Sequence, residues 1–379
     1  RRALAYKIQK GRIQTMVTKS AGKVILASAV MCVAVMAEAK EGEDTTGFKP
    51  AITVREMYSD NIYLTPRNQT DSWITTVKPQ GELIMKSGVQ KLTLGANTEA
   101  GYYTTDTRNN YVDWSGHAKA EVEITPRNHI EGLARYSHKH ERIGEGASEL
   151  RSKVTLQKEP DEFNQTDGDL KYTFGAKGAR SKLVLRDIYM EKEYSNNRAL
   201  NRNLDRKDNE FRETGSLKVT PKTSVLLEGR QKSINYVEGN QANAIRDSDE
   251  TRVYIGAEWE KVANTTGAVR VGRMNKDFRN HNTPTVSTGR PISDARENQL
   301  LRGREDHFSA PSWEATATWK PLSYSSFTLD MNRQYRESET TLAFIDTTST
   351  RLTWNHDWSS VLRSKVYAGR SSDNYEGTA

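Results

Sequence analysis

The stretch AEVEITPRNHIEGLARYSHKHER (residues 120–142) decides how this chain folds. It contains two runs in which apolar and polar residues alternate, joined by Thr-Pro-Arg-Asn at 125–128. Alternation with a period of two indicates β-strands with one apolar and one polar face, and the short Pro-containing segment indicates a hairpin turn. The fold then depends on whether the apolar face touches a second sheet or lipid.

The same alternation recurs from Phe48 to the end of the chain. It predicts fifteen strands, at about 47–58, 72–85, 89–103, 112–124, 128–141, 166–175, 181–193, 210–220, 223–236, 250–261, 266–278, 308–319, 324–337, 343–357 and 361–371. Several of these exceed ten residues, which is longer than the five or six usual in soluble sheets. Strands of this length suit a tilted membrane crossing.

The connections between the strands alternate between short and long. Short turns are expected at 86–89, 125–128, 177–180, 220–223, 263–266, 320–323 and 357–360, and long polar loops at 142–165, 194–209, 237–249 and 279–307. Short turns on one rim and long loops on the other are typical of outer-membrane barrels, where they are periplasmic and extracellular respectively.

The apolar face is too thin for a soluble core. Only 35% of the residues are hydrophobic, the mean hydropathy is −0.80, and no run of 18 apolar residues could form a transmembrane helix. A soluble sandwich needs bulkier residues than Ala120, Gly132 and Ala134, whereas lipid fills the space that small residues leave. A backbone in lipid must also pair every amide, which only a closed sheet achieves. We therefore predict an all-β, antiparallel transmembrane β-barrel over residues 40–379.

The strand count is odd, although both termini of such a barrel normally lie in the periplasm and require an even number. Either one strand is miscounted or the closing strand is missing from this chain, so about sixteen strands are expected for the complete barrel. Sixteen strands leave a water-filled lumen, whereas about eight would be filled by side chains.

The first 39 residues carry an export signal. Lys19 and Lys23 precede the apolar run VILASAVMCVAVMA, and Ala-Glu-Ala follows at 37–39, as in a secretory signal peptide over 16–39 that is cut after Ala39. Residues 1–15 would then be an upstream extension. Seven Lys and Arg and one Glu leave with this segment, so a formal charge of +7 falls to about +1. The pI of 9.2 is accordingly poor support for nucleic-acid binding, and the only cysteine, Cys32, is also removed.

Aromatic residues gather near both ends of the predicted strands, as expected for belts at the two membrane interfaces. Beside the short turns lie Trp259, Trp319, Tyr324, Trp354 and Trp358. Near the long loops lie Tyr102, Tyr103, Tyr111, Trp114, Tyr189, Phe211, Tyr236, Phe278, Phe308 and Tyr335.

Three stretches, 48–66, 121–142 and 313–338, resemble the outer-membrane β-barrel porins found beside bacterial exopolysaccharide and capsule biosynthesis genes. The first, FKPAITVREMYSDNIYLTP, is similar to that family's opening strand, with Asp60-Asn61 where the family has an Asp-Asn pair. The resemblance extends over about 48–375, but the family's terminal strand with its aromatic end is absent. It implies an outer-membrane pore that serves polysaccharide export.

Alternation also selects the residues that face the lumen. They are Lys119, Glu121, Glu123, Glu131, Arg135, Lys182, Arg186, Lys218, Glu228, Arg230, Glu258, Arg363 and Lys365, with Tyr254 and Tyr367 as faces for sugar rings. Opposed charges across a pore set a transverse field that discriminates among permeants. The alternative is a solvated barrel interior whose charges are paired for stability alone.

Other chemistry has little support in the sequence. His138, His140 and Glu141 offer too few ligands for a metal at a strand end, and no nucleophile elbow, phosphate loop or thiolate cluster occurs. We expect no cofactor. The leading hypothesis is a channel in contact with outer-membrane lipid, with polysaccharide as permeant and periplasmic export machinery as a partner. Two alternatives stay open: a glycan- or lipid-modifying outer-membrane enzyme with a Ser-His pair, and a structural or adhesive barrel that acts through its long loops, such as 279–307.

Overall fold

A computed structural model of the chain describes residues 5–9, 12–20, 30–38, 46–63, 65, 68–145, 157–237, 246–279, 307–337, 344–359 and 363–376. For the first three ranges, and for Arg363, Tyr375 and Glu376, only the backbone is described. Short helical segments lie in the connections: η1 (Thr107–Asn109), α1 (Arg198–Asn201) and η4 (Arg202–Leu204). No helix in these ranges has the length and apolar character needed to cross a membrane.

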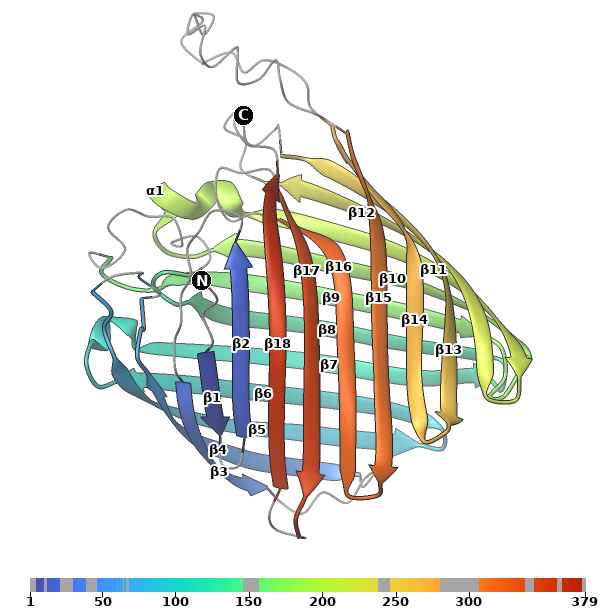
Figure 1. The fold of residues 1–379 in the computed structure, drawn as a ribbon, viewed down its shortest axis with the longest axis horizontal. Helices are drawn as coiled ribbons and strands as arrows, with labels where there is room; N and C mark the ends of the chain where they lie inside the picture. Colours follow the sequence, from blue (N-terminus) through green and yellow to red (C-terminus); the bar gives the residue numbers. More distant parts are fainter. Residues whose placement is uncertain are drawn as a thin grey trace, which may run out of the picture.

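Fifteen long strands follow one another from Gly47 onward, and each corresponds to one predicted segment (Figure 1). They are β4 (Gly47–Ser59), β5 (Ser72–Ser87), β6 (Gln90–Tyr103), β7 (Tyr111–Thr125), β8 (Asn128–Glu141), β9 (Asp161–Phe174), β10 (Ser181–Tyr194), β11 (Arg206–Thr220), β12 (Thr223–Tyr236), β13 (Ser248–Val262), β14 (Thr265–Phe278), β15 (His307–Leu322), β16 (Ser325–Glu337), β17 (Phe344–Asp357) and β18 (Arg363–Glu376). The prediction of an all-β, antiparallel barrel is confirmed.

The largest differences from the predicted boundaries occur at the ends toward the long connections. β9 begins at Asp161 rather than 166, and β18 extends to Glu376 rather than 371. Residues 161–165 are mostly polar on both faces, so the alternation that marks a strand between lipid and water is lost there. The predicted loop at 279–307 lies almost entirely outside the described residues.

Each strand from β4 to β18 pairs with the next in antiparallel orientation, so this part of the sheet is a succession of hairpins. In the β7–β8 hairpin, Val122 lies opposite Ile130 and Glu121 opposite Glu131, as the alternation predicts. Backbone pairing alone therefore places the charged and the apolar residues on separate faces.

Three further strands close the ring. They are β1 (Ala5–Gln9), β2 (Arg12–Ser20) and β3 (Val30–Glu38), whose backbones lie between β18 and β4. β18 pairs with β2 in parallel and β3 with β4 in antiparallel orientation. The sheet thus contains eighteen strands rather than the expected sixteen, because β4 and β18 are bridged by three strands instead of one. Removal of 16–39 as a leader stays a prediction.

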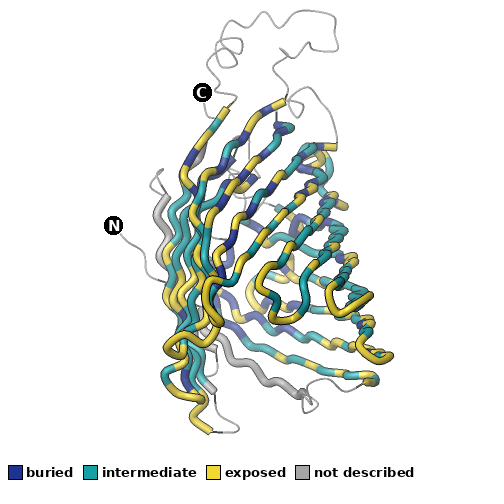
Figure 2. Tube along the Cα trace, turned by 90° about the vertical axis from the view of Figure 1, so that its right-hand side faces the viewer, coloured by how far each residue is buried: buried dark blue, intermediate teal, exposed yellow. Residues whose placement is uncertain are grey.

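The sheet is apolar on the outside and charged on the inside, the reverse of a soluble protein. Ile255 and Leu227 are 64% and 63% exposed, whereas the inward Lys276 is 0% exposed. Figure 2 shows exposed and less exposed positions alternating along the strands. Exposed apolar area on this scale requires a non-aqueous neighbour. The apolar face therefore touches lipid.

Most of the buried apolar side chains form three clusters near the strand ends that lead into the long connections. Their members are Met57, Ile62, Tyr63, Ile74, Tyr103 and Ile143; Met274, Phe278, Ala310, Tyr335 and Phe344; and Phe163, Tyr194 and Leu204. Tyr111 packs against the first cluster and Phe308 against the second.

These clusters correct part of the aromatic-belt prediction. Six of the ten residues assigned to the belt near the long loops are buried or packed inside the barrel: Tyr103, Tyr111, Tyr236, Phe278, Phe308 and Tyr335. The reason is their phase in the alternation, since Phe278, for example, follows the inward Lys276 by two residues and shares its face.

On the lipid face near the short turns, three aromatic rings stack across neighbouring strands. The Phe327 ring centroid lies 5.7 Å from that of Trp319 and 6.1 Å from that of Trp354, and the ring planes are inclined by 29° and 8° respectively. Trp319 is 48% exposed. This outer aromatic stack lies where the sequence predicts a belt at the membrane interface.

Candidate functional site

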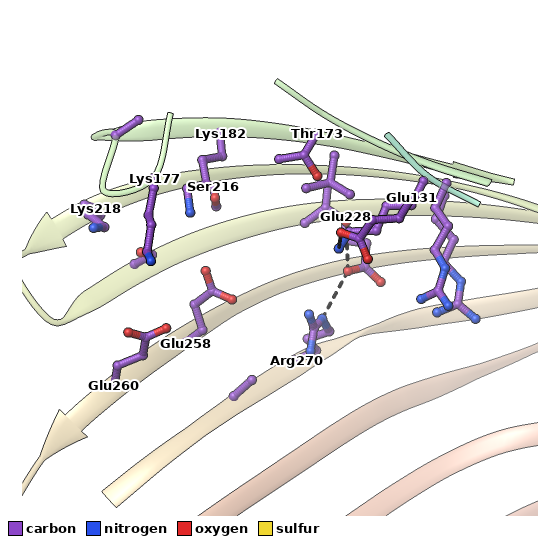
Figure 3. Close-up of a pocket in the computed structure, with 18 of the residues that line it drawn as sticks. Glu131, Thr173, Lys177, Lys182, Ser216, Lys218, Glu228, Glu258, Glu260 and Arg270 are labelled. Carbon is purple, nitrogen blue, oxygen red and sulfur yellow. Dashed lines mark hydrogen bonds and ion pairs between the residues drawn. The ribbon is translucent and has the colours of Figure 1, made fainter. Parts of the chain in front are cut away.

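A cavity of about 1160 Å³ lies inside the barrel, toward the short turns (Figure 3). Its wall is formed by residues of β7 to β15 and by the turns at 175–180 and 221–222. Most of the charged and hydroxylated lining residues are the inward, alternate residues of their strands, so nine strands together build one largely polar surface. The cavity is therefore the candidate functional site.

Eight of the thirteen residues predicted to face the lumen line this cavity: Lys119, Glu131, Lys182, Arg186, Lys218, Glu228, Arg230 and Glu258. The strand register places three more on the same face of β7 and β8, namely Glu121, Glu123 and Arg135. The last two lie on β18, where the backbone register places Arg363 opposite Asp357 and Lys365 opposite Asn355. Their role in lining a conducting pore stays a prediction.

Five cations stand opposite one another at one level of the wall. We call them the basic row: Lys171, Arg186, Arg212, Arg230 and Arg252, on the consecutive strands β9 to β13. Like charges in directly opposed cross-strand positions are destabilising. Such a row is stable only when acidic side chains lie close to it.

Each cation of the basic row has a carboxylate partner. Lys171 Nζ lies 2.8 Å from Glu131 Oε1, Arg186 Nε donates to Asp169 Oδ1 over 2.8 Å, and Arg212 pairs with Glu210. Arg230 donates two bonds to Glu314, of 2.6 and 2.8 Å, and Arg252 lies 2.6 Å from Glu250. Planar, two-point pairing of this kind is the preferred geometry of guanidinium with carboxylate.

The sequence prediction missed several members of this site. Lys171, Arg212, Arg252, Arg270 and Glu314 all face inward but were not selected. The signal was present, since Lys171 is in phase with Asp169 and Arg212 with Glu210 along their strands. Their opposition across strands, however, requires the register.

Near the long connections, the lumen wall is closed around a buried charge network, the Lys276 cluster. Lys276 Nζ lies 2.6 Å from Glu337 Oε1 and 3.1 Å from Glu250 Oε1, and Tyr236 donates to Glu337 over 2.7 Å. The side chains of Lys276, Glu250 and Glu337 are at most 2% exposed. Phe278 and Phe344 shield the ammonium, with ring centroids 5.4 and 5.8 Å from Nζ.

A second network at the same end has the same composition. Lys192 Nζ lies 2.5 Å from Glu141 Oε1, and Tyr194 donates to the same carboxylate over 2.9 Å. The ammonium lies 4.4 Å from the Phe163 centroid. An inward lysine, a glutamate and aromatic rings thus recur, which indicates a packed rather than a water-filled wall at this end.

Above this wall, the β6–β7 connection is held by Asp106. Arg108 Nε donates to its Oδ1 over 2.9 Å and to its Oδ2 over 3.0 Å, and Tyr63 also donates to the carboxylate. The hydrogen bonds from Arg108 lower the pKa of Asp106 from its usual 3.8 to about 2.

Two of the described histidines, His138 and His140, lie against aromatic rings on the β7–β8 hairpin. His138 stacks on Trp114 and contacts Asn164, and His140 stacks on Tyr111 and contacts Asp113. Among the residues that the structure describes, no three His, Cys, Asp or Glu side chains gather where a metal ion could be held. The side chains that line the cavity offer a bound solute charges and hydrogen-bonding groups.

Residues 46–291, which include β4 to β14, match the protein family described as "Putative beta-barrel porin 2". The chain belongs to this family. The resemblance to β-barrel porins seen in the sequence is thereby confirmed. Porins are channels of outer membranes whose lumen is polar and lined by alternate strand residues, and this porin's cavity has that character.

No curated protein matches this porin significantly. Among solved structures, it is similar to the siderophore receptor PiuA from Acinetobacter baumannii, with 10% identity, a TM-score of 0.43, and coverage of 93% of this chain and 66% of the receptor. It is also similar to the ferric yersiniabactin uptake receptor FyuA from Yersinia pestis, with 8% identity, a TM-score of 0.40, and coverage of 91% of this chain and 59% of the receptor. The porin thus spans less than two thirds of either receptor's length, and neither receptor's ligand is transferred to it.

Proposed function

We propose that this porin is the outer-membrane channel through which a Gram-negative bacterium releases an exopolysaccharide for its capsule or biofilm matrix. The observation that carries the proposal is the cavity of about 1160 Å³ with its polar wall of mixed charge, in a barrel of the porin family. A glycan is a chain of hydroxyl groups, and it needs hydrogen-bonding partners that replace water at each step. The inward Thr173, Thr214 and Ser216, together with the charged residues, offer such partners.

The exopolysaccharide itself is inferred from the resemblance of residues 48–66, 121–142 and 313–338 to porins encoded beside polysaccharide biosynthesis genes. In this proposal the short turns face the periplasm, where a component of the export machinery delivers the polymer. The cavity lies at this end of the barrel. The incoming chain would then meet the polar wall first.

We also propose that the chain reaches the periplasm with residues 16–39 as a signal peptide, which is removed after Ala39. Mass spectrometry of the protein purified from outer membranes should find Lys40 at the amino terminus. A mature protein that retains 30–38 would overturn the cleavage and would leave β3 in the barrel wall.

Two measurements test the channel. Planar-bilayer recordings of the refolded full chain should show stable conductance steps, and a silent, sealed barrel would reject a channel of any kind. Deletion of the gene should abolish polysaccharide outside the cell, and wild-type complementation should restore it. A conducting barrel whose deletion leaves capsule and matrix unchanged would reject polysaccharide export and keep the porin.

A further inference from the structure

The cavity has an excess of positive charge. Eleven Lys and Arg side chains line it, against six Asp and Glu. This excess is local, since the chain after Ala39 carries a formal charge of only about +1. A water-filled passage with low-dielectric walls and charge of one sign concentrates ions of the opposite sign. The excess is therefore a property of the site.

Much of the excess lies next to the short turns. We call these residues the mouth cations: Lys177, Arg180, Lys182, Lys218 and Lys222. Among the described residues, the Nζ atoms of Lys218 and Lys222 donate only to backbone carbonyls, those of Gly178 and Lys261 respectively. Within the part of the chain that the structure describes, no carboxylate pairs with any mouth cation. Figure 3 shows Lys177, Lys182 and Lys218 near one another at this end of the cavity.

Deeper in the cavity, the basic row continues the positive surface. The side chains of Lys171, Arg186 and Arg212 are 34%, 39% and 29% exposed, so they are accessible to a solute. Arg230 and Arg252, only 6% and 7% exposed, are held in the wall. Lys171, Arg186 and Arg212 therefore form a second group of accessible cations, deeper in the cavity than the mouth cations.

We propose that the permeant is an acidic polysaccharide whose repeating units carry carboxylates, and that the mouth cations and the accessible part of the basic row bind these groups in succession. This inference rests on the proposed export function and specifies its substrate class. Guanidinium groups donate two parallel hydrogen bonds to a carboxylate, and a neutral glycan has no carboxylate to accept them.

The wall carboxylates explain how such binding stays reversible. Asp169 and Glu131 already occupy Arg186 and Lys171, so a glycan carboxylate binds by exchange with a wall carboxylate. The two states then differ little in free energy. Conduction requires binding that is favourable enough for entry and weak enough for exit, and exchange at successive cations meets both conditions.

The test uses the refolded full chain in a planar bilayer with a KCl gradient. The reversal potential should show preference for chloride over potassium. A hexamer of galacturonate added on the short-turn side should block the current, whereas maltohexaose, a neutral hexasaccharide, should block it much more weakly. Raising the salt concentration should weaken the block, because exposed charges are then screened.

Charge-reversing substitutions of the mouth cations test whether these residues cause the block by hexagalacturonate. Lys177→Glu, Lys182→Glu and Lys218→Glu should each weaken hexagalacturonate block by about 1.5- to 5-fold, the range of a solvent-exposed ion pair, and the triple variant should lose anion preference. Lys158→Glu is the matched control, because Lys158 is exposed in the connection before β9, far from the short turns. It should leave block and selectivity unchanged.

The outcomes separate the two proposals. A conducting barrel that prefers potassium, or that both hexamers block equally, overturns the acidic substrate and leaves the channel intact. Absence of conductance rejects the channel. In that case, calorimetry of hexagalacturonate binding to the protein in detergent tests only the binding of carboxylates by the mouth cations and the basic row. Binding that the triple variant loses supports it, and no binding overturns it.

Discussion

The two ends of the lumen wall use the same residue types in opposite ways. Near the long connections, Lys276 is completely buried and contacts two carboxylates and two aromatic rings. Near the short turns, Lys177 and Lys182 line an open cavity, and none of the described carboxylates pairs with them. An inward lysine is thus structural at one end and available for binding at the other.

Inward position alone therefore does not define a pore-lining residue. Burial of a charge is tolerated only when partners compensate for the lost water, so the Lys276 cluster stabilises the barrel as a unit. An unpaired cation in water costs little and keeps its capacity to bind. The two ends should therefore respond very differently to the same substitution.

The largest expected effect is at the closed end. Lys276→Met leaves Glu250 and Glu337 buried without their shared cation, which should lower the free energy of unfolding by about 3–5 kcal/mol. Urea unfolding of the barrel in lipid vesicles measures it. Lys182→Met, the same change at the open end, should stay within about 0.5 kcal/mol. If both variants lose the same free energy of unfolding, Lys276 is no more important for stability than Lys182, and the two ends of the wall do not differ as described.

A second prediction tests whether lipid lies behind this wall. Ile255, in the middle of β13 and 64% exposed, faces outward, so Ile255→Arg should cost about 2–4 kcal/mol near the bilayer midplane. Thr214→Arg, on an inward cavity position beside Glu228, should cost about 0.5 kcal/mol or less. If the inward variant is the less stable of the two, the assignment of the faces is wrong.

A third prediction addresses the packing of the closed end. A Cβ on Gly101 would lie 2.1 Å from Cε1 of Tyr111, whose ring packs against the first apolar cluster and stacks on His140 at 3.6 Å. Gly101→Ala should therefore cost about 1–3 kcal/mol through overpacking, as measured by urea unfolding. Gly132→Ala, with nothing within 4 Å of the added atom, serves as the control and should be nearly neutral.

The smallest effect concerns the β6–β7 connection above the closed end. The pKa of Asp106 is lowered to about 2, so its contribution to stability is fully present above the usual carboxyl pKa of about 4 and disappears as the pH falls toward 2. Hydrogen exchange of residues 104–110 should stay slow, after correction for intrinsic rates, down to about pH 4 and accelerate below it. Asp106→Asn should exchange faster at neutral pH and lose this transition.

The strands could be predicted from the sequence because alternation is a local signal. The β7–β8 register, which follows from one short turn, places Lys119, Glu121 and Glu131 on one face of the sheet for the same reason. The phase of Phe278 was equally readable beside Lys276, but its position near a loop suggested a membrane belt instead.

The basic row and the Lys276 cluster could not be predicted, because they depend on contacts between strands. Arg186, Arg212 and Arg230 lie opposite one another only because of the register of two successive hairpins. Irregularities in the pairing, such as the one between Lys218 and Thr220, shift this register. Glu337 reaches Lys276 from a strand that is not its neighbour in the sheet. Distances around a barrel wall depend on its curvature, which no local pattern encodes.

The outer aromatic stack of Trp319, Phe327 and Trp354 has a consequence for how the barrel sits in its bilayer. The three rings anchor β15 to β17 at the headgroup level, while the part of the same short-turn rim that carries Lys177 and Lys222 can shift in depth at lower cost. In a thinner bilayer, the barrel would then tilt about the side that carries the outer aromatic stack, and its depth would not change evenly around the rim.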